Sequence, residues 1–339
     1  MSIKSQLMTF LEARGAPGYE HDVAKLVAEG MKKYCDPVSI DDFNNVTGMM
    51  GEKGPLVYCC AHIDEIAMMV TTIEDDGFLG FTSVGGIDPR ILMAKEVWVG
   101  SEPLYGIVGA KPPHVLSPED VEKTIKMKDL YIDVGLSYEA VCEKVQVGDI
   151  ITFHAPPVKL MGGHIASQCL DDRMGVAVMM EAMKRLTKKE LGCRAAFAAV
   201  AQEEVGSAGA NAGAQRLKPD MAIIVEVTFG KTPDSDPAKT HDLDKVSLMI
   251  SPFLDRKLFE AIKKTAKRLD MELCIDVNGR STGTDADSVQ VAGEGVPCAV
   301  LQVPLRYMHT TVETLNYKTL KKAGRLLGEF LLSIDSKEG

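Results

Sequence analysis

The second half of the chain alternates between two apolar patterns, and this alternation strongly limits the folds open to it. From about residue 165, segments with apolar residues three and four apart, such as 171–186 and 255–269, alternate with short apolar runs, such as 221–227 and 297–303. The first pattern indicates helices with one buried face, and the second indicates buried strands. We therefore predict an α/β fold with a mixed, largely parallel sheet flanked by helices.

Residues 66–160 show a different sequence pattern. Short β-rich pieces, such as IAMMVTTI and LYGIVGA, are separated by Gly and Pro clusters such as GGIDPR. We expect a small β-rich domain inserted into the larger α/β domain, which then consists of residues 1–65 and 161–339. One short helix is expected within residues 117–131 of the insertion.

The composition excludes several classes of protein. The chain has 339 residues and a net charge of −10, and the absence of a basic run argues against a nucleic-acid partner. No apolar stretch approaches the length of a membrane span, and the first residues do not resemble a signal peptide. The eight cysteines form no C-x-x-C pair, so we interpret them as buried reduced thiols. We expect a cytoplasmic protein with no membrane partner.

Short motifs far apart in the chain carry acids and histidines that the predicted sheet would bring together. They supply six side chains: His62, Asp171, Glu203, Glu204, Glu226 and His309. Five of these end or follow a predicted strand, and the sixth opens a predicted helix. Open α/β sheets bind ligands beyond the carboxyl ends of their strands, so we expect all six at one edge of the sheet.

These residue types are suited to a pair of divalent cations, which predicts a metallohydrolase. Glu226 interrupts a hydrophobic strand, where a carboxylate is costly unless it is paired or coordinated. Glu203 and Glu204 are adjacent and diverge, so we expect one to bind metal and the other to deprotonate a water. Asp64 lies two residues beyond His62 on an extended segment, from where it could orient the imidazole.

Each residue taken alone also has an ordinary structural explanation. Asp171 could cap the helix that it opens, and the two adjacent glutamates could be solvated loop charges. A single histidine at a strand end is more often a hydrogen-bonded loop residue than a ligand. The gathering of all the motifs at one sheet edge is what favours a metal site.

The motifs AHIDE, CLDDR, QEEVG and RYMHTTVE resemble those of the co-catalytic aminopeptidases, which include glutamyl, lysyl and deblocking enzymes. The resemblance runs nearly from end to end and includes STGTDADSVQ. Some relatives carry an older cellulase M or endoglucanase label. The resemblance implies two divalent metal ions per subunit, zinc or cobalt, with manganese as a further candidate.

The resemblance also assigns roles to individual residues. It implies that Asp171 bridges both metals, that Glu203 is the general base and that Asp64 orients His62. It pairs His62 with Glu226 on one metal, and Glu204 with His309 on the other. The resemblance places Thr284 and Asp285 near the substrate.

Two departures from the family pattern affect the expected specificity. Many members have Asp where this chain has Glu226, and the polar segment 228–245 differs from the usual pattern. The preferred side chain of the substrate therefore stays open. The resemblance further implies that short peptides are substrates, and that the inserted domain builds a dimer and then a dodecamer with its active sites facing an inner chamber.

Three other functions remain as alternatives. A deacylase or carboxypeptidase-like amidohydrolase would use the same site on a different substrate. A glycosidase needs paired carboxylates that flank a sugar bond, whereas Glu203 and Glu204 are adjacent and the chain has one Trp and 6% aromatic residues. A non-enzymatic binding or assembly protein would require a decayed site, yet every matched position holds a competent residue.

Overall fold

A mixed sheet forms the centre of the molecule, as expected. The computed structural model describes residues 1–117, 119 and 123–335, and the large sheet has the strand order β1-β2-β12-β3-β13-β16-β14-β15. In this order the strands are Val38–Ile40, Val46–Met50, Arg194–Val200, Leu56–His62, Met221–Phe229, Cys298–Leu305, Val246–Ile250 and Leu273–Val277. The four central strands are parallel, while β2 runs antiparallel to β12 and β14 antiparallel to β16.

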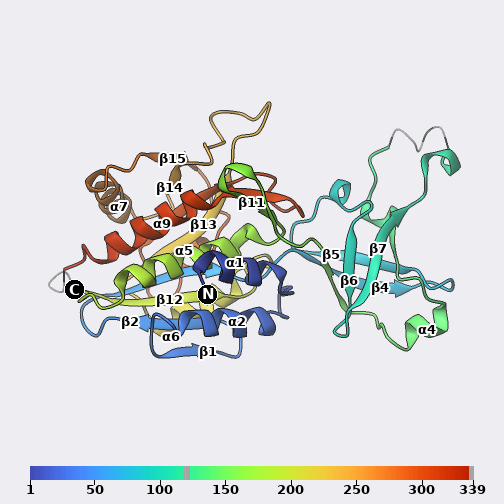
Figure 1. The fold of residues 1–339 in the computed structure, drawn as a ribbon, viewed down its shortest axis with the longest axis horizontal. Helices are drawn as coiled ribbons and strands as arrows, with labels where there is room; N and C mark the ends of the chain where they lie inside the picture. Colours follow the sequence, from blue (N-terminus) through green and yellow to red (C-terminus); the bar gives the residue numbers. More distant parts are fainter. Residues whose placement is uncertain (118, 120–122, 336–339) are drawn as a thin grey trace.

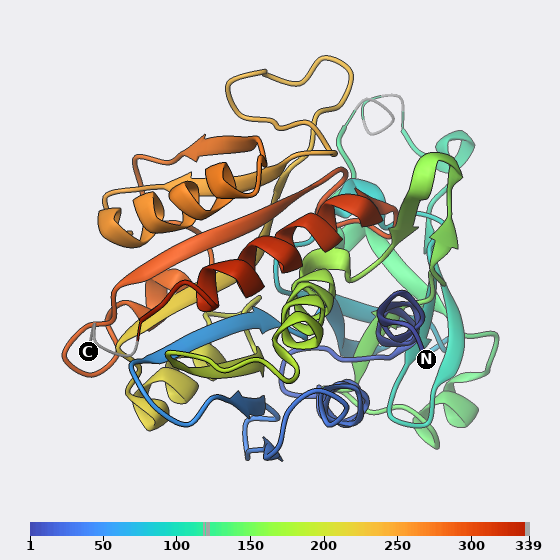
Figure 2. The ribbon, with the colours of Figure 1, turned by 60° about the vertical axis from the view of Figure 1, so that its left-hand side comes forward.

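Helices cover both faces of this sheet (Figures 1 and 2). One face packs against five helices: α1 (Ile3–Glu12), α2 (His21–Met31), α5 (Leu170–Leu186), α7 (Arg256–Arg268) and α9 (Tyr317–Leu331). The other face packs against α6 (Ala208–Leu217) and α8 (Ala286–Val289). The central helix α5 is buried almost all round, because it lies between α1, α9 and the sheet. Apolar residues on most sides of this helix are what allow it to be buried in this position.

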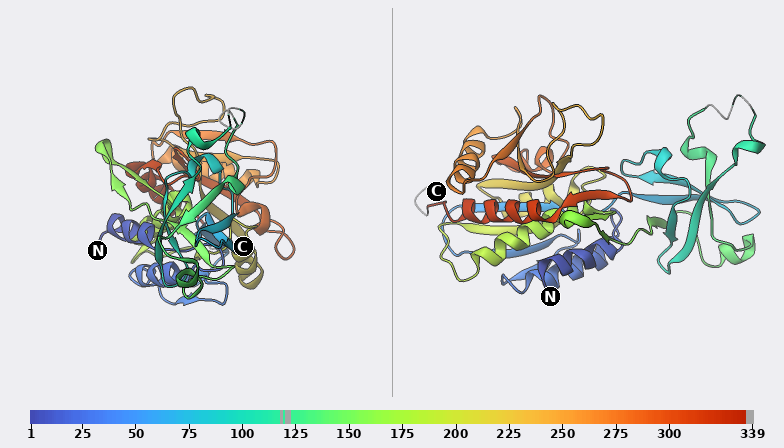
Figure 3. Two further views of the ribbon diagram at one scale, coloured as in Figure 1. Left: turned by 90° about the vertical axis from the view of Figure 1, so that its right-hand side faces the viewer. Right: turned by 45° about the horizontal axis from the view of Figure 1, so that its top comes forward.

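A closed barrel stands beside the α/β body, at one end of the large sheet (Figures 1 and 3). Its strand order is β4-β5-β8-β7-β6-β9. In that order the strands are Ala67–Ile73, Leu79–Val84, Leu130–Asp133, Leu104–Ala110, Glu96–Val99 and Ile150–Phe153, and helix α4 spans Tyr138–Cys142. The barrel has its own apolar core. The short helix expected within 117–131 falls in part outside the described residues.

A small antiparallel sheet, which the sequence patterns did not reveal, closes one side of the α/β body. It consists of β10 (Val158–Lys159), β11 (His164–Ser167) and β17 (Glu313–Asn316). The strands are too short for a clear period-two pattern. In this sheet Ser167 pairs with Glu313, so the chain entering α5 lies beside the chain entering α9. Among the described residues, no helix is long and apolar enough to span a bilayer.

Helices α5 and α9 approach closely because two glycines of α9 face α5. A Cβ atom at Gly324 would lie 2.5 Å from Cβ of Glu181 and 2.8 Å from the carbonyl oxygen of Val178. At Gly328, the nearest atom to such a Cβ is Cδ of Arg185 at 3.3 Å, which belongs to a flexible side chain. The two glycines therefore differ in how much a methyl group would disturb the packing.

We predict that Gly324→Ala lowers the free energy of unfolding by about 1–3 kcal/mol, because overpacking outweighs the higher helix propensity of Ala. Gly328→Ala is the matched control, and we expect it to be neutral or stabilising. Chemical denaturation followed by circular dichroism measures both. Equal stability of the two variants would contradict the packing argument.

Candidate metal centre

The four central strands of the sheet carry most of the candidate residues at or near their carboxyl ends. His62 is the last residue of β3 and pairs in register with Val200, the last residue of β12. Glu203 and Glu204 follow β12 after a short turn, and Glu226 lies within β13. The strands β12, β3, β13 and β16 are neighbours, so these residues gather at one edge of the sheet.

Asp171, in the first turn of α5, connects the two halves of the site. Its Oδ1 lies 3.1 Å from Nε2 of His62, and its Oδ2 lies 3.4 Å from Nε2 of His309. That same Nε2 of His309 lies 3.2 Å from Oε1 of Glu204. Two groups of possible ligands result, His62 with Asp171 and Glu226, and Asp171 with Glu204 and His309; within each group the ligand atoms lie within 4.8 Å of one another. The two groups share Asp171.

Backbone carbonyls fix the orientation of both histidines. Nδ1 of His62 lies 3.2 Å from the carbonyl oxygen of Asp64, and Nδ1 of His309 lies 2.9 Å from that of Gly86. A carbonyl only accepts hydrogen bonds, so in the neutral ring each Nδ1 carries the proton and each Nε2 keeps its lone pair. Both lone pairs therefore face the centre of the site, which is the tautomer that a metal ligand requires.

The buried carboxylates of the site have few cationic partners. Asp171 and Glu226 are 7% and 5% exposed, and in the described part of the chain the ion pairs of this group are with histidines alone. Burial, followed by the nearby carboxylates of Asp172 and Asp171, raises the pKa of Glu226 well above its usual range. Burial lowers the pKa of His309, but its hydrogen bonds with Asp171 and Glu204 outweigh this effect and raise the pKa to about 11.

The balance of buried charge and the types of donor atoms indicate whether metal ions fit the site. Carboxylates that are removed from water are costly unless positive charge compensates them. The site offers oxygen and imidazole ligands, two groups of three, and no Lys or Arg within the described ion pairs of those groups. Such a donor set fits two divalent cations.

Asp64 links more parts of the site than its sequence position indicates. Besides the contact of its carbonyl with His62, its Oδ1 lies 3.4 Å from Nδ1 of the same ring. Its carboxylate also accepts hydrogen bonds from the backbone N–H groups of Glu203 (3.0 Å) and Glu204 (3.1 Å). Asp64 is fully buried. It therefore fixes the turn after β12 relative to the end of β3.

A cavity of about 480 Å³ opens beside these residues. Glu203 lines it and belongs with His62 and Glu204 to a further group of possible ligands. Burial raises the pKa of Glu203 to about 8. Thr284 lines the same cavity, whereas Asp285 is fully buried and is not part of the lining.

Glu313 is a residue of this site that the sequence reasoning missed. Its Oε2 accepts a hydrogen bond from the backbone N–H of Asp171 (3.1 Å), and its Oε1 accepts one from that of His309 (2.9 Å). The side chain is 2% exposed. One carboxylate thus holds the backbone of two candidate ligands. The only signal in the sequence is an acidic residue four positions after His309, which is too common a pattern to identify a role.

The barrel also contributes to the site through the turn after β5. Gly86 supplies the carbonyl that orients His309, and a Cβ at Gly86 would lie 3.1 Å from Nδ1 of that ring. In addition, Nζ of Lys95 donates to Oγ1 of Thr311 at 2.8 Å. The loop that carries His309 is therefore held by the inserted segment, far away in sequence.

Comparison with known proteins agrees with this geometry. Residues 44–326 match the family model described as M42 glutamyl aminopeptidase, and the chain belongs to this family. It is 33% identical to a lysyl aminopeptidase of Pyrococcus furiosus over 94% of this chain and 95% of that protein. These matches and the fold define a peptide hydrolase of the aminopeptidase class.

Solved structures with this fold include both peptidases and a protein named as an endoglucanase. A TET aminopeptidase from a marine sediment thaumarchaeote matches with a TM-score of 0.93 and 30% identity, over 98% of this chain and 96% of that one. The TET1 peptidase of Pyrococcus horikoshii, which can assemble into a tetrahedron or a large octahedral shell, matches with a TM-score of 0.86 and 31% identity, over 98% and 100%. An endoglucanase of Thermotoga maritima matches with a TM-score of 0.77 and 25% identity, over 96% of each chain.

We predict that Glu313→Gln weakens metal binding by about 10–100-fold, because an amide has one acceptor oxygen and leaves one of the two backbone N–H groups without its partner. Competition with a chromogenic zinc chelator measures the affinity. Glu294→Gln, at an exposed position, is the control. Unchanged zinc affinity in Glu313→Gln would show that this carboxylate does not position the ligands.

Proposed function

We propose that this protein removes N-terminal residues from peptides with a two-metal centre at the carboxyl edge of its sheet. The observation that carries the proposal is the sharing of Asp171 by two groups of three possible ligands. Asp171 would bridge the two metals, His62 and Glu226 would complete one shell, and Glu204 and His309 the other. Two bound divalent ions, zinc, cobalt or manganese, would lower the pKa of a water and polarise the scissile carbonyl.

Glu203 is the side chain best placed to move protons in this site. It lines the cavity and lies outside both groups that share Asp171. Its carboxylate would take a proton from the attacking water and deliver it to the amine of the leaving peptide. Asp64 supports this role, because it holds the backbone N–H of Glu203 and faces the imidazole of His62.

The barrel is proposed to serve assembly as well as the site. We propose residues 66–160 as the segment that forms a dimer and, from dimers, a dodecamer. The likeness to the TET1 peptidase of Pyrococcus horikoshii, which assembles into large shells, supports this. The turn at Gly86 would then connect the assembly domain to the histidine that it orients.

We predict that Glu203→Gln retains two metals per chain and loses turnover by about 10²–10⁴-fold, because the amide cannot accept the proton. Glu204→Gln is the neighbouring comparison and should lose metal as well as activity. Elemental analysis and a fluorogenic aminoacyl substrate separate the two effects. Wild-type turnover in Glu203→Gln would show that Glu203 is not the general base.

The proposed substrate class is tested with one peptide prepared in two forms, with a free or an acetylated N-terminus. We expect release of free amino acids from the free form alone, loss of this activity after treatment with a chelator, and its return on addition of Zn²⁺ or Co²⁺. Equal cleavage of the acetylated form would instead favour a deacylase or another amidohydrolase. Activity that persists after complete removal of metal would contradict the two-metal proposal.

A further inference from the structure

A second hollow lies where α5 and α9 meet, and residues of a different kind from those of the metal centre line it. It has a volume of about 600 Å³, and all seven lining residues are charged: Glu181, Lys184, Arg185, Lys318, Lys321, Lys322 and Arg325. None of them lines the cavity at the metal centre. We call this hollow the cationic groove. Six cations and one carboxylate gather here on a chain whose net charge is −10.

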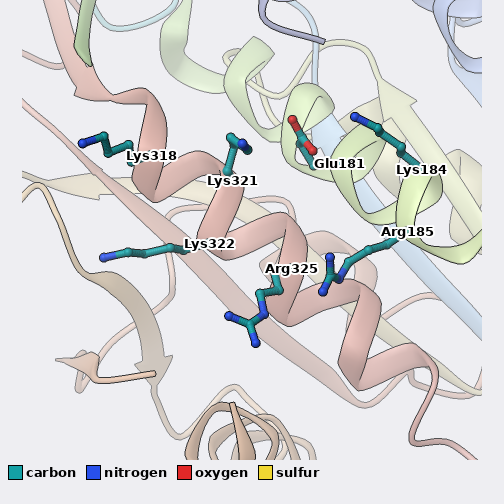
Figure 4. A pocket seen from close by; sticks show the side chains of 7 residues that line it. All are labelled: Glu181, Lys184, Arg185, Lys318, Lys321, Lys322 and Arg325. Carbon is teal, nitrogen blue, oxygen red and sulfur yellow. The ribbon is translucent and has the colours of Figure 1, made fainter. Parts of the chain in front are cut away.

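The geometry of α9 places four of these cations on one face. Lys318, Lys321, Lys322 and Arg325 are spaced three and four residues apart, so they lie side by side along the helix. Figure 4 shows Arg185 of α5 reaching toward α9, while the side chains of Lys318 and Lys322 point away from α5. The close approach of the helices at Gly324 and Gly328 brings Arg185 beside the cations of α9.

Helix stability does not account for the cations of α9. Lys318 lies in the first turn, where the positive end of the helix dipole disfavours a cation, and this turn has no acidic residue. Like charges three and four residues apart repel each other by a few tenths of a kcal/mol per pair. Lys184 and Arg185, in contrast, lie in the last turn of α5, where cations are favourable. The row on α9 is therefore slightly unfavourable for the helix by itself, and an anionic ligand would offset this cost.

Internal partners neutralise only part of the groove. Arg185 lies 3.3 Å from Glu329, and Nζ of Lys322 donates to the carbonyl oxygen of Asp244 at 2.7 Å. Over the described ranges of the chain, Lys184, Lys318, Lys321 and Arg325 form no ion pair with any acidic side chain. Four cations are thus available to a ligand.

The lining also indicates what kind of ligand fits. It contains no aromatic or aliphatic residue that could bind a nucleobase or an apolar side chain, so recognition rests on charge. Residues 318 to 325 span about 10 Å along the helix axis. A short chain of linked phosphate groups concentrates several negative charges within such a length, so it can face several of these cations at once. Lysine is a frequent ligand of phosphate as a mobile point charge.

We infer that the cationic groove binds a short run of linked phosphate groups, either as a condensed inorganic phosphate or as the triphosphate of a nucleotide. This site is separate from the metal centre and does not depend on the proposed peptidase mechanism. Both sources of ligand share the chemistry that the groove recognises. An acidic peptide would present carboxylates without the same density of charge.

The test is isothermal titration calorimetry of the metal-loaded, assembled protein with sodium tripolyphosphate at low salt. We expect binding that weakens as NaCl is added. The double variant Lys321→Glu with Arg325→Glu should bind about tenfold or more weakly, and Lys321→Gln with Arg325→Gln should show a smaller loss. The matched control, Lys264→Glu with Lys267→Glu on α7, makes a similar charge change at exposed positions and should stay within about twofold of wild type.

Further arms identify the ligand and exclude an artefact. ATP binding as tightly as tripolyphosphate would assign recognition to the triphosphate alone, while orthophosphate should bind far more weakly. Metal content after the titration shows whether tripolyphosphate has removed metals, an effect that the groove variants would leave unchanged. Equal binding by wild type and the charge-reversed groove variant would overturn the proposal. Binding of oligoglutamate without binding of tripolyphosphate would overturn it in favour of an acidic peptide.

Discussion

The concentration of buried carboxylates around Asp171 is the constraint on which the rest of the site depends. Asp171 and Glu226 are removed from water, and histidines are their only positively charged neighbours among the described ion pairs. Such a group is unfavourable by itself and becomes favourable when divalent cations occupy it. Folding and metal binding should therefore be linked, because a ligand that binds only the folded state stabilises it. The fold supplies the rigidity: parallel strands fix His62 and Glu226, and α5 fixes Asp171, which the two groups of possible ligands share.

The sequence predicted the parts of this arrangement that depend on local pattern. A buried strand is recognisable from an apolar run, and the edge at which parallel strands end follows from the fold class. This logic was sufficient to bring His62, Glu203 and Glu226 to one place. The glutamate within β13 was itself informative, because a charge in a buried strand needs a partner. The proposed role of Asp171 as a bridge between two metals came from the family resemblance, since an acidic residue at the start of a helix has a commoner explanation.

The contacts that depend on tertiary structure could not be predicted in this way. Glu313 acts through the backbone N–H groups of Asp171 and His309, and Gly86 acts through its carbonyl oxygen. A backbone group has no sequence signature, so neither residue type nor spacing reveals it. The same applies to the carboxylate of Asp64, which accepts hydrogen bonds from the backbone N–H groups of Glu203 and Glu204, just after the neighbouring strand β12. These residues position the candidate ligands, and their partners become visible only when β11, β17 and the barrel are in place.

The cationic groove illustrates the same limit for charge. The linear sequence has a net charge of −10 and no basic run, which argued against a nucleic-acid partner. Folding nevertheless brings Lys184 and Arg185 of α5 beside the lysines of α9, more than 130 residues further along the chain. Net charge describes the average field of the molecule, whereas a ligand responds to the potential at one surface. The protein thus separates its charges, with buried carboxylates at the strand ends and clustered cations over α5 and α9. The two proposed ligands of opposite sign, divalent cations and phosphate groups, would therefore bind to one acidic chain without competing for the same residues.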